Sequence, residues 1–335
     1  MTARDTDWDG VRLHVVTGKG GTGKTTVAGA LALALAHRGR KVLLIEAEGR
    51  QGIARLFDRP PLPYEERRIA IGAGGNGDAS GPGGDVYALA IDPEGALLDY
   101  LQMFYNMRSA GKALTKLGLV DFATTIAPGL SDVLVTGKAT EAARRKKPGG
   151  GYIYDAVVMD APPTGRIGRF LNVTAEVSGL AKVGPIRTHA DTVANVIKSP
   201  QTVVHFVSTL EEMPVQETLD GVAELRAIPG LHVGGVVINM ARPTRPSPEV
   251  LQAPPDTGAL AAALSAAGLY GTDTLAEDLT EELTEHARQV EMQDRERGEL
   301  ESAGQPCYEL PMITDGIDLA GLYRLAAELR NQGAA

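Results

Sequence analysis

Short apolar runs alternate with longer segments of helical periodicity along most of the chain. The short runs contain four to seven residues, and several are continuous and rich in β-branched residues, as strands buried on both faces of a sheet are. This alternation is typical of an α/β fold in which a mostly parallel sheet is flanked by helices. The expected strands are residues 12–16, 41–45, 86–91, 156–159, 202–208, 233–239 and 308–312, and the clearest helices are residues 25–38, 214–227, 275–302 and 319–329.

Two segments interrupt the alternation within what we expect to be a single domain, residues 1–335. Residues 92–147 are mostly helical in pattern and predict a helical insertion between strands. Their Met and aromatic residues, between 97 and 107, either belong to the core or line an adaptable apolar groove. Residues 72–84 are rich in glycine with Asn, Asp, Ser and Pro, and they predict a flexible loop because they can bury little apolar surface.

A glycine-rich segment, TGKGGTGKTT, joins the first expected strand to the first expected helix. It matches the phosphate-binding pattern G-x-x-x-x-G-K-[ST], and its glycines let successive backbone N–H groups face one phosphate-sized concavity. Lys24 is placed to reach the β- and γ-phosphates, and the Thr25 hydroxyl to bind Mg²⁺. We therefore expect a P-loop NTPase that binds ATP or ADP through Gly18, Lys19, Gly20, Gly21, Thr22, Gly23, Lys24, Thr25 and Thr26.

A second candidate for nucleotide chemistry follows the strand at residues 156–159. Asp160 comes directly after this apolar strand, where an acid can hold a water of the Mg²⁺ shell, so Thr25 and Asp160 are the expected metal residues. The next residues, Ala-Pro-Pro-Thr-Gly-Arg, contain two prolines and a glycine that fix a tight loop. Such a loop beside the phosphates, with Pro163 at the nucleotide, suits a sensor of the γ-phosphate.

These two motifs together resemble those of a known family. KGGTGKTT at residues 19–26 resembles the deviant Walker A loop of the MinD/ParA/ArsA class of dimeric ATPases. DAPPTGR at 160–166, with Arg-Phe-Leu at 169–171, resembles the D-T-A-P-T-G-H…R-x-L signature of arsenite-pump ATPases and of the ATPase for guided entry of tail-anchored proteins. Further matches at 87–93, 128–132 and 310–312 extend the resemblance from residue 12 to about residue 329, and it looks closest to the paired actinobacterial branch of this family.

The resemblance implies roles for individual residues. Lys19 would cross a dimer interface to the partner's nucleotide, although a solvated loop lysine is the alternative. Lys24 and Asp160 would act in catalysis together with Lys19. The amide of Asn239 would read the adenine edge, with Pro311 and Met312 near the base.

The sequence departs from the family pattern at two functional positions. Where the family has an Asp that orients the attacking water, counting back from Leu56 and Phe57 places Glu48, whose carboxylate has a longer arm. Glu48 either serves that catalytic role, with slow hydrolysis expected, or faces solvent in a mobile loop. Arg166 stands where the family signature has a histidine.

Composition argues against several classes of partner and ligand. A net charge of −9 argues against nucleic acid as a partner. Cys307 is the single cysteine, so no zinc or arsenite site is expected within one chain. The amino terminus is polar and acidic, unlike a signal peptide, and no apolar stretch approaches the roughly 20 residues of a membrane span, so we expect a soluble cytoplasmic protein.

These features favour a Mg²⁺-dependent dimeric ATPase that converts ATP and water to ADP and phosphate. The resemblance implies a homodimer, or a heterodimer with a paralogous ATPase, which couples hydrolysis to handling an apolar client protein or a membrane-protein partner. An alternative is a nucleotide-binding scaffold subunit with little hydrolysis of its own. An arsenite-pump subunit or a partitioning ATPase fits less well, because the chain shows neither clustered thiols nor a clear terminal membrane helix or basic face.

Overall fold

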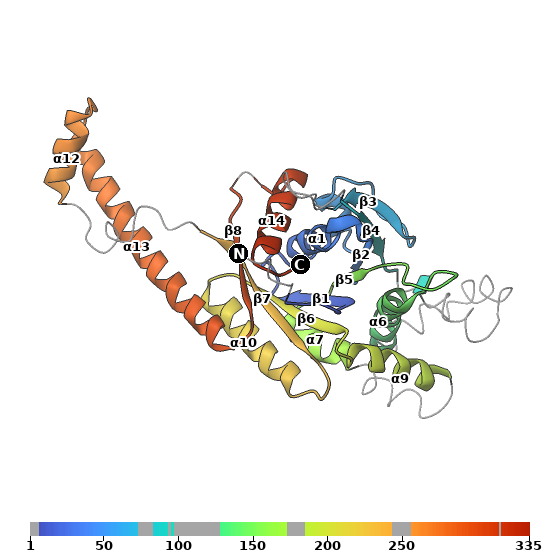
Figure 1. Ribbon diagram of the computed structural model, residues 1–335. Helices are drawn as coiled ribbons and strands as arrows, with labels where there is room; N and C mark the ends of the chain where they lie inside the picture. Colours follow the sequence, from blue (N-terminus) through green and yellow to red (C-terminus); the bar gives the residue numbers. More distant parts are fainter. Residues whose placement is uncertain are drawn as a thin grey trace.

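An eight-stranded sheet forms the centre of the computed structural model, which describes residues 7–72, 83–92, 95–96, 128–172, 185–242, 256–314 and 316–335 (Figure 1). The strand order is β3-β4-β2-β5-β1-β6-β7-β8, and every neighbouring pair is parallel except β3 and β4. This confirms the predicted α/β fold with a mostly parallel sheet. The strands are β1 Leu13–Gly18, β2 Val42–Glu46, β3 Arg67–Ile71, β4 Asp85–Ala90, β5 Ala156–Asp160, β6 Thr202–Ser208, β7 Val233–Ala241 and β8 Cys307–Pro311.

Seven of these strands lie within two residues of their expected bounds, but β3 was missed. Its sequence, RRIAI, contains two arginines, and only Ile69 is buried. It pairs on one side only, at the antiparallel edge of the sheet. An edge strand that buries one side chain has almost no hydrophobic pattern to detect.

Alternate residues of the central strands face two separate helical layers. One layer contains α1 Lys24–Leu35, α2 Gly52–Leu56 and α14 Leu319–Asn331, whose apolar residues pack with Val16, Leu44 and Val158. The other contains α6 Pro128–Arg144, α7 Thr164–Leu171, α9 Pro185–Ile197 and α10 Glu212–Arg226, which pack with Val15, Ile45 and Phe206. Burial on both faces explains why the central strands read as continuous apolar runs. A short 3₁₀ turn, His37–Gly39, follows α1.

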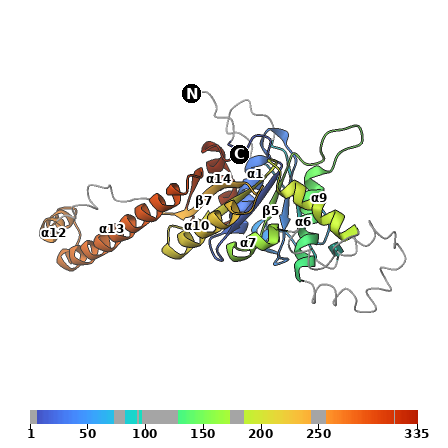
Figure 2. The ribbon, with the colours of Figure 1, turned by 90° about the horizontal axis from the view of Figure 1, so that it is seen from below.

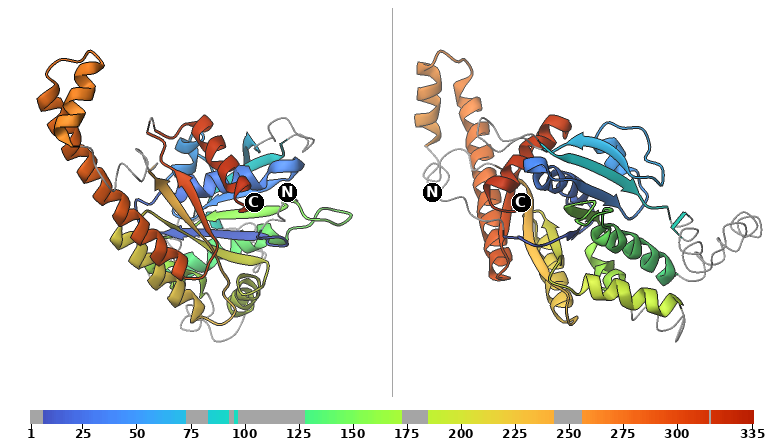
Figure 3. Two further views of the ribbon diagram at one scale, coloured as in Figure 1. Left: turned by 60° about the vertical axis from the view of Figure 1, so that its left-hand side comes forward. Right: turned by 45° about the vertical axis from the view of Figure 1, so that its right-hand side comes forward.

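Two helices extend away from this sandwich, as Figures 1, 2 and 3 show from four directions. These are α12 Thr257–Ala266 and α13 Thr272–Ser302, and we call residues 257–302 the arm. The carboxyl-terminal end of α13 packs beside α10, where Leu300 joins the core. Farther out, Ala261 and Ala276 are buried between the two helices. The long solvated helix expected at residues 275–302 is thus present, whereas α12 was not anticipated.

The two expected interruptions fall largely outside the described residues. Residues 73–82 of the glycine-rich segment and residues 97–127 of the helical insertion, including its Met and aromatic residues, are among those not described. The remainder of the insertion contains α6, in which Val133, Val135 and Ala139 are buried in the core. No helix in the described ranges is long and apolar enough to cross a bilayer.

Candidate nucleotide-binding site

Polar side chains gather at the carboxyl edge of the sheet. Thr17 lies at the end of β1, Glu46 and Asp160 end β2 and β5, and Asn239 lies near the end of β7. Asp160 is paired in register with Glu46 on one side and with Val16 on the other. Ligands of parallel α/β sheets bind at this edge, beyond the strand ends.

The phosphate loop runs from β1 to α1 and has left-handed glycines at two points. Gly21 and Gly23 have φ angles of 94° and 85°, in the left-handed region that favours glycine. At Gly23, a Cβ would lie 2.3 Å from Nδ2 of Asn239. The same Nδ2 donates a hydrogen bond of 2.9 Å to the Thr22 carbonyl oxygen. The loop is therefore fastened to β7 by contacts that only a glycine at position 23 permits.

The carbonyl oxygen of Lys19 organises the inside of the loop. It accepts hydrogen bonds from the Thr22 hydroxyl at 2.9 Å, from the Thr22 N–H at 3.4 Å and from Lys24 Nζ at 3.4 Å. Burial lowers the pKa of Lys24, while the negative charges of Asp160 and Glu48 oppose that shift. A half-buried ammonium group among these backbone groups is suited to a polyphosphate anion.

Thr25 and Asp160 form the candidate Mg²⁺ site. The Thr25 hydroxyl donates a hydrogen bond of 2.6 Å to Oδ2 of Asp160. Burial raises the pKa of Asp160 to about 6, although the bond from Thr25 and the charge of Lys24 both favour its ionised form. Mg²⁺ prefers oxygen ligands and retains several waters, so a hydroxyl and a carboxylate at this spacing fit the ion. A divalent cation would also stabilise the ionised Asp160 carboxylate that burial disfavours.

The tight loop after Asp160 is joined to β1. The Thr17 hydroxyl donates to the Pro162 carbonyl oxygen at 2.7 Å. Pro163 then occupies the N-cap position of α7, with Thr164 as the first helical residue. The DAPPTGR segment is therefore placed next to the start of the phosphate loop, as a phosphate sensor requires.

The side chain of Lys19 points to a different element from Lys24. Its Nζ forms an ion pair of 2.7 Å with Oε1 of Glu217, on α10. The other carboxylate oxygen of Glu217 accepts a hydrogen bond of 3.3 Å from the Thr164 hydroxyl, at the start of α7. One glutamate therefore links the phosphate loop to the loop after β5.

Glu48 lies in the loop between β2 and α2 and is held by arginines. Its carboxylate is 3.6 Å from a guanidinium nitrogen of Arg166 and 3.5 Å from one of Arg50. The negative charge of Glu48 acts to raise the pKa of both Lys24 and Asp160. Glu46 fastens the same loop, because its carboxylate accepts from the N–H groups of Gly52 and Ile53 at 3.0 and 3.4 Å.

Comparison with known proteins agrees with this geometry. The family model for anion-transporting ATPases, ArsA_ATPase, matches residues 11–189, which is more than half of the chain. The chain is 48% identical over 328 residues to the ATPase BagA of Mycobacterium tuberculosis, covering 97% of this chain and 94% of that protein. This protein belongs to the ArsA family of ATPases. It is 27% identical over 219 residues to the ATPase get3 of Botryotinia fuckeliana, covering 65% of this chain and 58% of that protein.

The ArsA-family fold brings the sequence-predicted site residues to one edge of the sheet. Gly18, Gly20 and Thr26 belong to the phosphate loop and the first turn of α1. Pro311 ends β8, and the Met312 N–H donates to the Ala241 carbonyl oxygen at 2.8 Å, which places both one strand beyond Asn239. Asn239 is buried and bonded to the phosphate loop. Its contact with adenine, and those of Pro311 and Met312, stay predictions.

Sequence reasoning missed three features of this ArsA-family site. Glu46 anchors the Glu48 loop through the N–H groups of Gly52 and Ile53, a role that depends on where α2 begins. Glu217 faces Lys19 across 198 positions of sequence, which no local pattern reveals. Met240 is half-exposed and has a φ of 58°, an uncommon backbone conformation for a side chain of this size, and its methyl group lies near Gly23.

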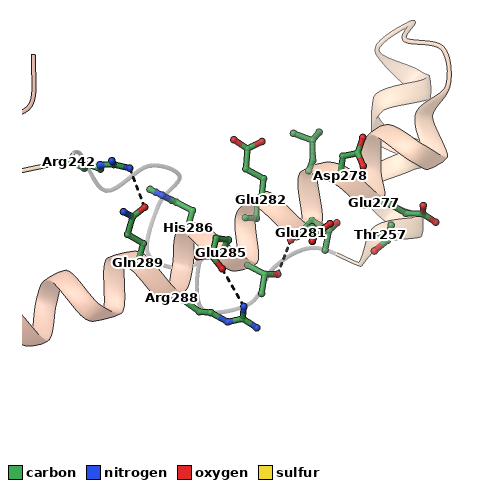
Figure 4. A pocket seen from close by; sticks show the side chains of 14 residues that line it. Arg242, Thr257, Glu277, Asp278, Glu281, Glu282, Glu285, His286, Arg288 and Gln289 are labelled. Atoms are coloured by element: carbon green, nitrogen blue, oxygen red, sulfur yellow. Dashed lines mark hydrogen bonds and ion pairs between the residues drawn. The ribbon is translucent and has the colours of Figure 1, made fainter. Parts of the chain in front are cut away.

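A groove on the arm is a separate feature. It has a volume of about 1320 Å³ and runs along the outer part of α13 (Figure 4). Its lining contains Glu277, Asp278, Glu281, Glu282 and Glu285 and no residue of the phosphate loop. Acidic side chains repel polyphosphate, so this groove does not compete with the sheet edge as the candidate nucleotide site. Among the described residues no group of three or more His, Cys, Asp or Glu side chains is arranged to hold a metal ion.

Proposed function

We propose that this ATPase is a Mg²⁺-dependent dimeric switch that couples ATP hydrolysis to the handling of a client or partner protein. ATP binding closes two subunits over their nucleotides, and hydrolysis releases them. The dimer is either a homodimer or a heterodimer with a paralogous ATPase. Bound Mg²⁺ would neutralise charge that develops on the transferred phosphoryl group.

The observation that carries this proposal is that two lysines on one loop point in different directions. Lys24 is half-buried and lies against the inside of the loop, where it serves the subunit's own nucleotide. Lys19 points out of the loop toward Glu217, and its side chain is 29% exposed. A cation at the edge of the phosphate loop can exchange its ion pair with Glu217 for the phosphates of a second subunit, which a monomeric ATPase would not need.

The experiment compares Lys19→Ala with Lys24→Ala in isothermal calorimetry, ATP-dependent light scattering and single-turnover hydrolysis. We expect Lys24→Ala to lower ATP affinity by about 10- to 100-fold, because it removes a charge-assisted contact to a polyanion. Lys19→Ala should bind ATP within about twofold of wild type but lose association and turnover. Lys147→Ala, an exposed lysine outside the site, serves as the control.

Each outcome decides a separate part of the proposal. Unchanged ATP affinity in Lys24→Ala contradicts the nucleotide site itself. Wild-type association and turnover in Lys19→Ala contradict the dimeric switch. The chain is assayed alone and with any copurifying paralogous ATPase, which separates a homodimer from a heterodimer.

A nucleotide-binding scaffold with little hydrolysis is the second candidate. The observation that favours it is the pairing of Glu48 with two arginines, which leaves the carboxylate less free to polarise a water molecule. Replacement of Glu48 by Gln separates the two functions. In the switch, Glu48→Gln keeps ATP affinity and removes hydrolysis, whereas in the scaffold it leaves a low rate unchanged.

A further inference from the structure

Arg166 connects three elements around the nucleotide site. It lies in the first turn of α7, and its guanidinium group is 3.6 Å from Oε1 of Glu48 and 3.5 Å from Oδ1 of Asp132. Glu48 is in the loop after β2, and Asp132 is in α6. The carboxylate side chains are mostly covered, at 21% and 22% exposed, whereas that of Arg166 is 53% exposed.

The planar guanidinium of arginine can serve two carboxylates at once, which suits a bridge between separate elements. Arg166 uses two different nitrogens for its two partners, NH1 for Glu48 and NH2 for Asp132. The bond to α6 fixes the direction from which Arg166 approaches Glu48. A carboxylate on a flexible two-methylene arm thereby acquires a defined position relative to the sheet.

The second arginine near Glu48, Arg50, cannot fix the position of the Glu48 carboxylate relative to the sheet. Arg50 is two residues away in the same loop, its side chain is 74% exposed, and it contacts the other carboxylate oxygen at 3.5 Å. A contact within one loop moves with that loop and does not fix it to the core. The two arginines therefore add similar charge near Glu48, but only Arg166 joins it to two helices.

Glu48 and Arg166 are also two of the positions at which the site departs from the sequence pattern of the family. A longer acid stands for Asp and a longer base for His. The structure places the two departures in contact with each other. Lengthening the acid increases the number of positions open to its carboxylate, and a guanidinium partner from α7 reduces that number again.

We propose that Arg166 is a positioning residue that holds the Glu48 carboxylate at the phosphate site and thereby sets the rate of ATP hydrolysis. This inference rests on the proposed function, in which Glu48 orients the attacking water. Arg166 acts through Glu48 and does not bind the nucleotide. Its contribution therefore falls on kcat rather than on the affinity for ATP.

The experiment measures kcat and KM for ATP with Arg166→Ala, Arg166→Lys and Arg50→Ala. Because phosphoryl transfer depends on alignment, and misplacement by 1 Å can cost about 100-fold, we expect Arg166→Ala to lower kcat by at least about tenfold. KM should change by less than about twofold. Arg166→Lys keeps one cation and should recover part of the rate, and Arg50→Ala, the matched control, should stay within about twofold of wild type.

A double-mutant comparison tests whether Arg166 works through Glu48. In the Glu48→Gln background, Arg166→Ala should change the residual single-turnover rate by less than about twofold. An equal loss in both backgrounds, an unchanged kcat in Arg166→Ala, a raised KM at constant kcat, or equal losses in Arg50→Ala and Arg166→Ala would each overturn the proposal. Wild-type hydrolysis by Glu48→Gln alone would instead remove the proposed role of Glu48. ATP binding by calorimetry confirms that each variant is folded.

Discussion

The phosphate loop and the arm are held in shape by different kinds of contact. At the phosphate loop, hydrogen bonds join residues far apart in sequence: Thr25 with Asp160, Thr17 with Pro162, and Asn239 with Thr22. In the outer half of α13 the side-chain hydrogen bonds of the described residues are local, as in the bond from the Thr284 hydroxyl to the Thr280 carbonyl oxygen. The loop is therefore defined by tertiary structure, whereas the outer half of α13 is defined mainly by helix propensity and by its packing on α12.

Charge reinforces this contrast. Residues 272–287 contain six acidic residues and no Lys or Arg, namely Asp273, Glu277, Asp278, Glu281, Glu282 and Glu285. The phosphate loop instead places two lysines within six residues. Substitutions at the two regions should accordingly differ in size, and glycine-to-alanine changes should also differ in sign.

The largest effect is expected from Asp160→Asn. It should reduce Mg²⁺-dependent hydrolysis by at least about 100-fold, because the amide cannot replace a carboxylate near the metal. The same change should stabilise the nucleotide-free protein, because burial raises the pKa of Asp160 from 3.8 to about 6 and so disfavours the charged form. A shift of this size corresponds to about 3 kcal/mol above pH 6.

The pH dependence of the stability gained by Asp160→Asn serves as the control for this prediction. As the pH falls from 6 toward 4, folded wild-type protein takes up a proton at Asp160 before the unfolded chain does, so wild type gains stability and the difference from Asp160→Asn shrinks. Urea unfolding of both proteins at pH 7.5 and pH 4.5, about 1.5 units on either side of that pKa, measures the difference in stability. A difference that is constant with pH would contradict a buried charged carboxylate.

Gly23→Ala should have the next largest effect. Its Cβ would meet Asn239 Nδ2 at 2.3 Å and its φ of 85° is strained for alanine. We expect a loss of about 1–3 kcal/mol in the free energy of unfolding, with a marked loss of ATP affinity. Thermal denaturation and calorimetry report the two quantities, and a variant that matches wild type in both would show that β7 does not fix the loop.

Gly298→Ala should have a smaller effect of opposite sign. Gly298 is inside α13, is exposed, and has no neighbouring atom within 4 Å of the position a Cβ would take. Alanine is favoured over glycine in a helix interior, so the variant should be stabilised by about 0.5–1 kcal/mol. Urea unfolding measures the gain, and a loss of stability would mean that the arm is packed against something at this position.

The smallest effect is expected from Glu281→Lys on the arm. Glu277, Glu281 and Glu285 follow one another at intervals of four residues, so their charges repel along one face of α13. A lysine in the middle creates two attractive pairs, each worth about 0.2–0.5 kcal/mol at low salt. The stability gain should decrease at 1 M NaCl, and Glu281→Gln, which only removes repulsion, should give an intermediate value.

The parts of the site that sequence predicted are those with a local signature. Lys24 and Thr25 occupy fixed positions in a motif between a strand and a helix, and Asp160 directly follows an apolar run. Strand-end residues of a parallel sheet necessarily meet at one edge, so their proximity needed no knowledge of strand order.

The parts that sequence did not predict depend on contacts between distant segments. The Lys19–Glu217 pair requires that α10 pass the phosphate loop, and the tether of Glu48 requires α6 and α7 together. Strand β3 is specified by its neighbour β4 rather than by its own pattern. Helix α12 is rich in alanine and leucine, but it is a single helix of ten residues that gains a buried face only against α13.

The hydrogen bond between Asn239 and Thr22 can form only after most of the chain has been synthesised. The two residues are separated by 217 positions. At about 5–20 residues per second, a ribosome needs roughly 10–40 s after making the phosphate loop before it adds Asn239. During that interval the nascent chain already contains both lysines but lacks the strand that fastens them in place. The phosphate loop is therefore fastened to β7 only late in the synthesis of the chain, and an unfinished subunit lacks that contact.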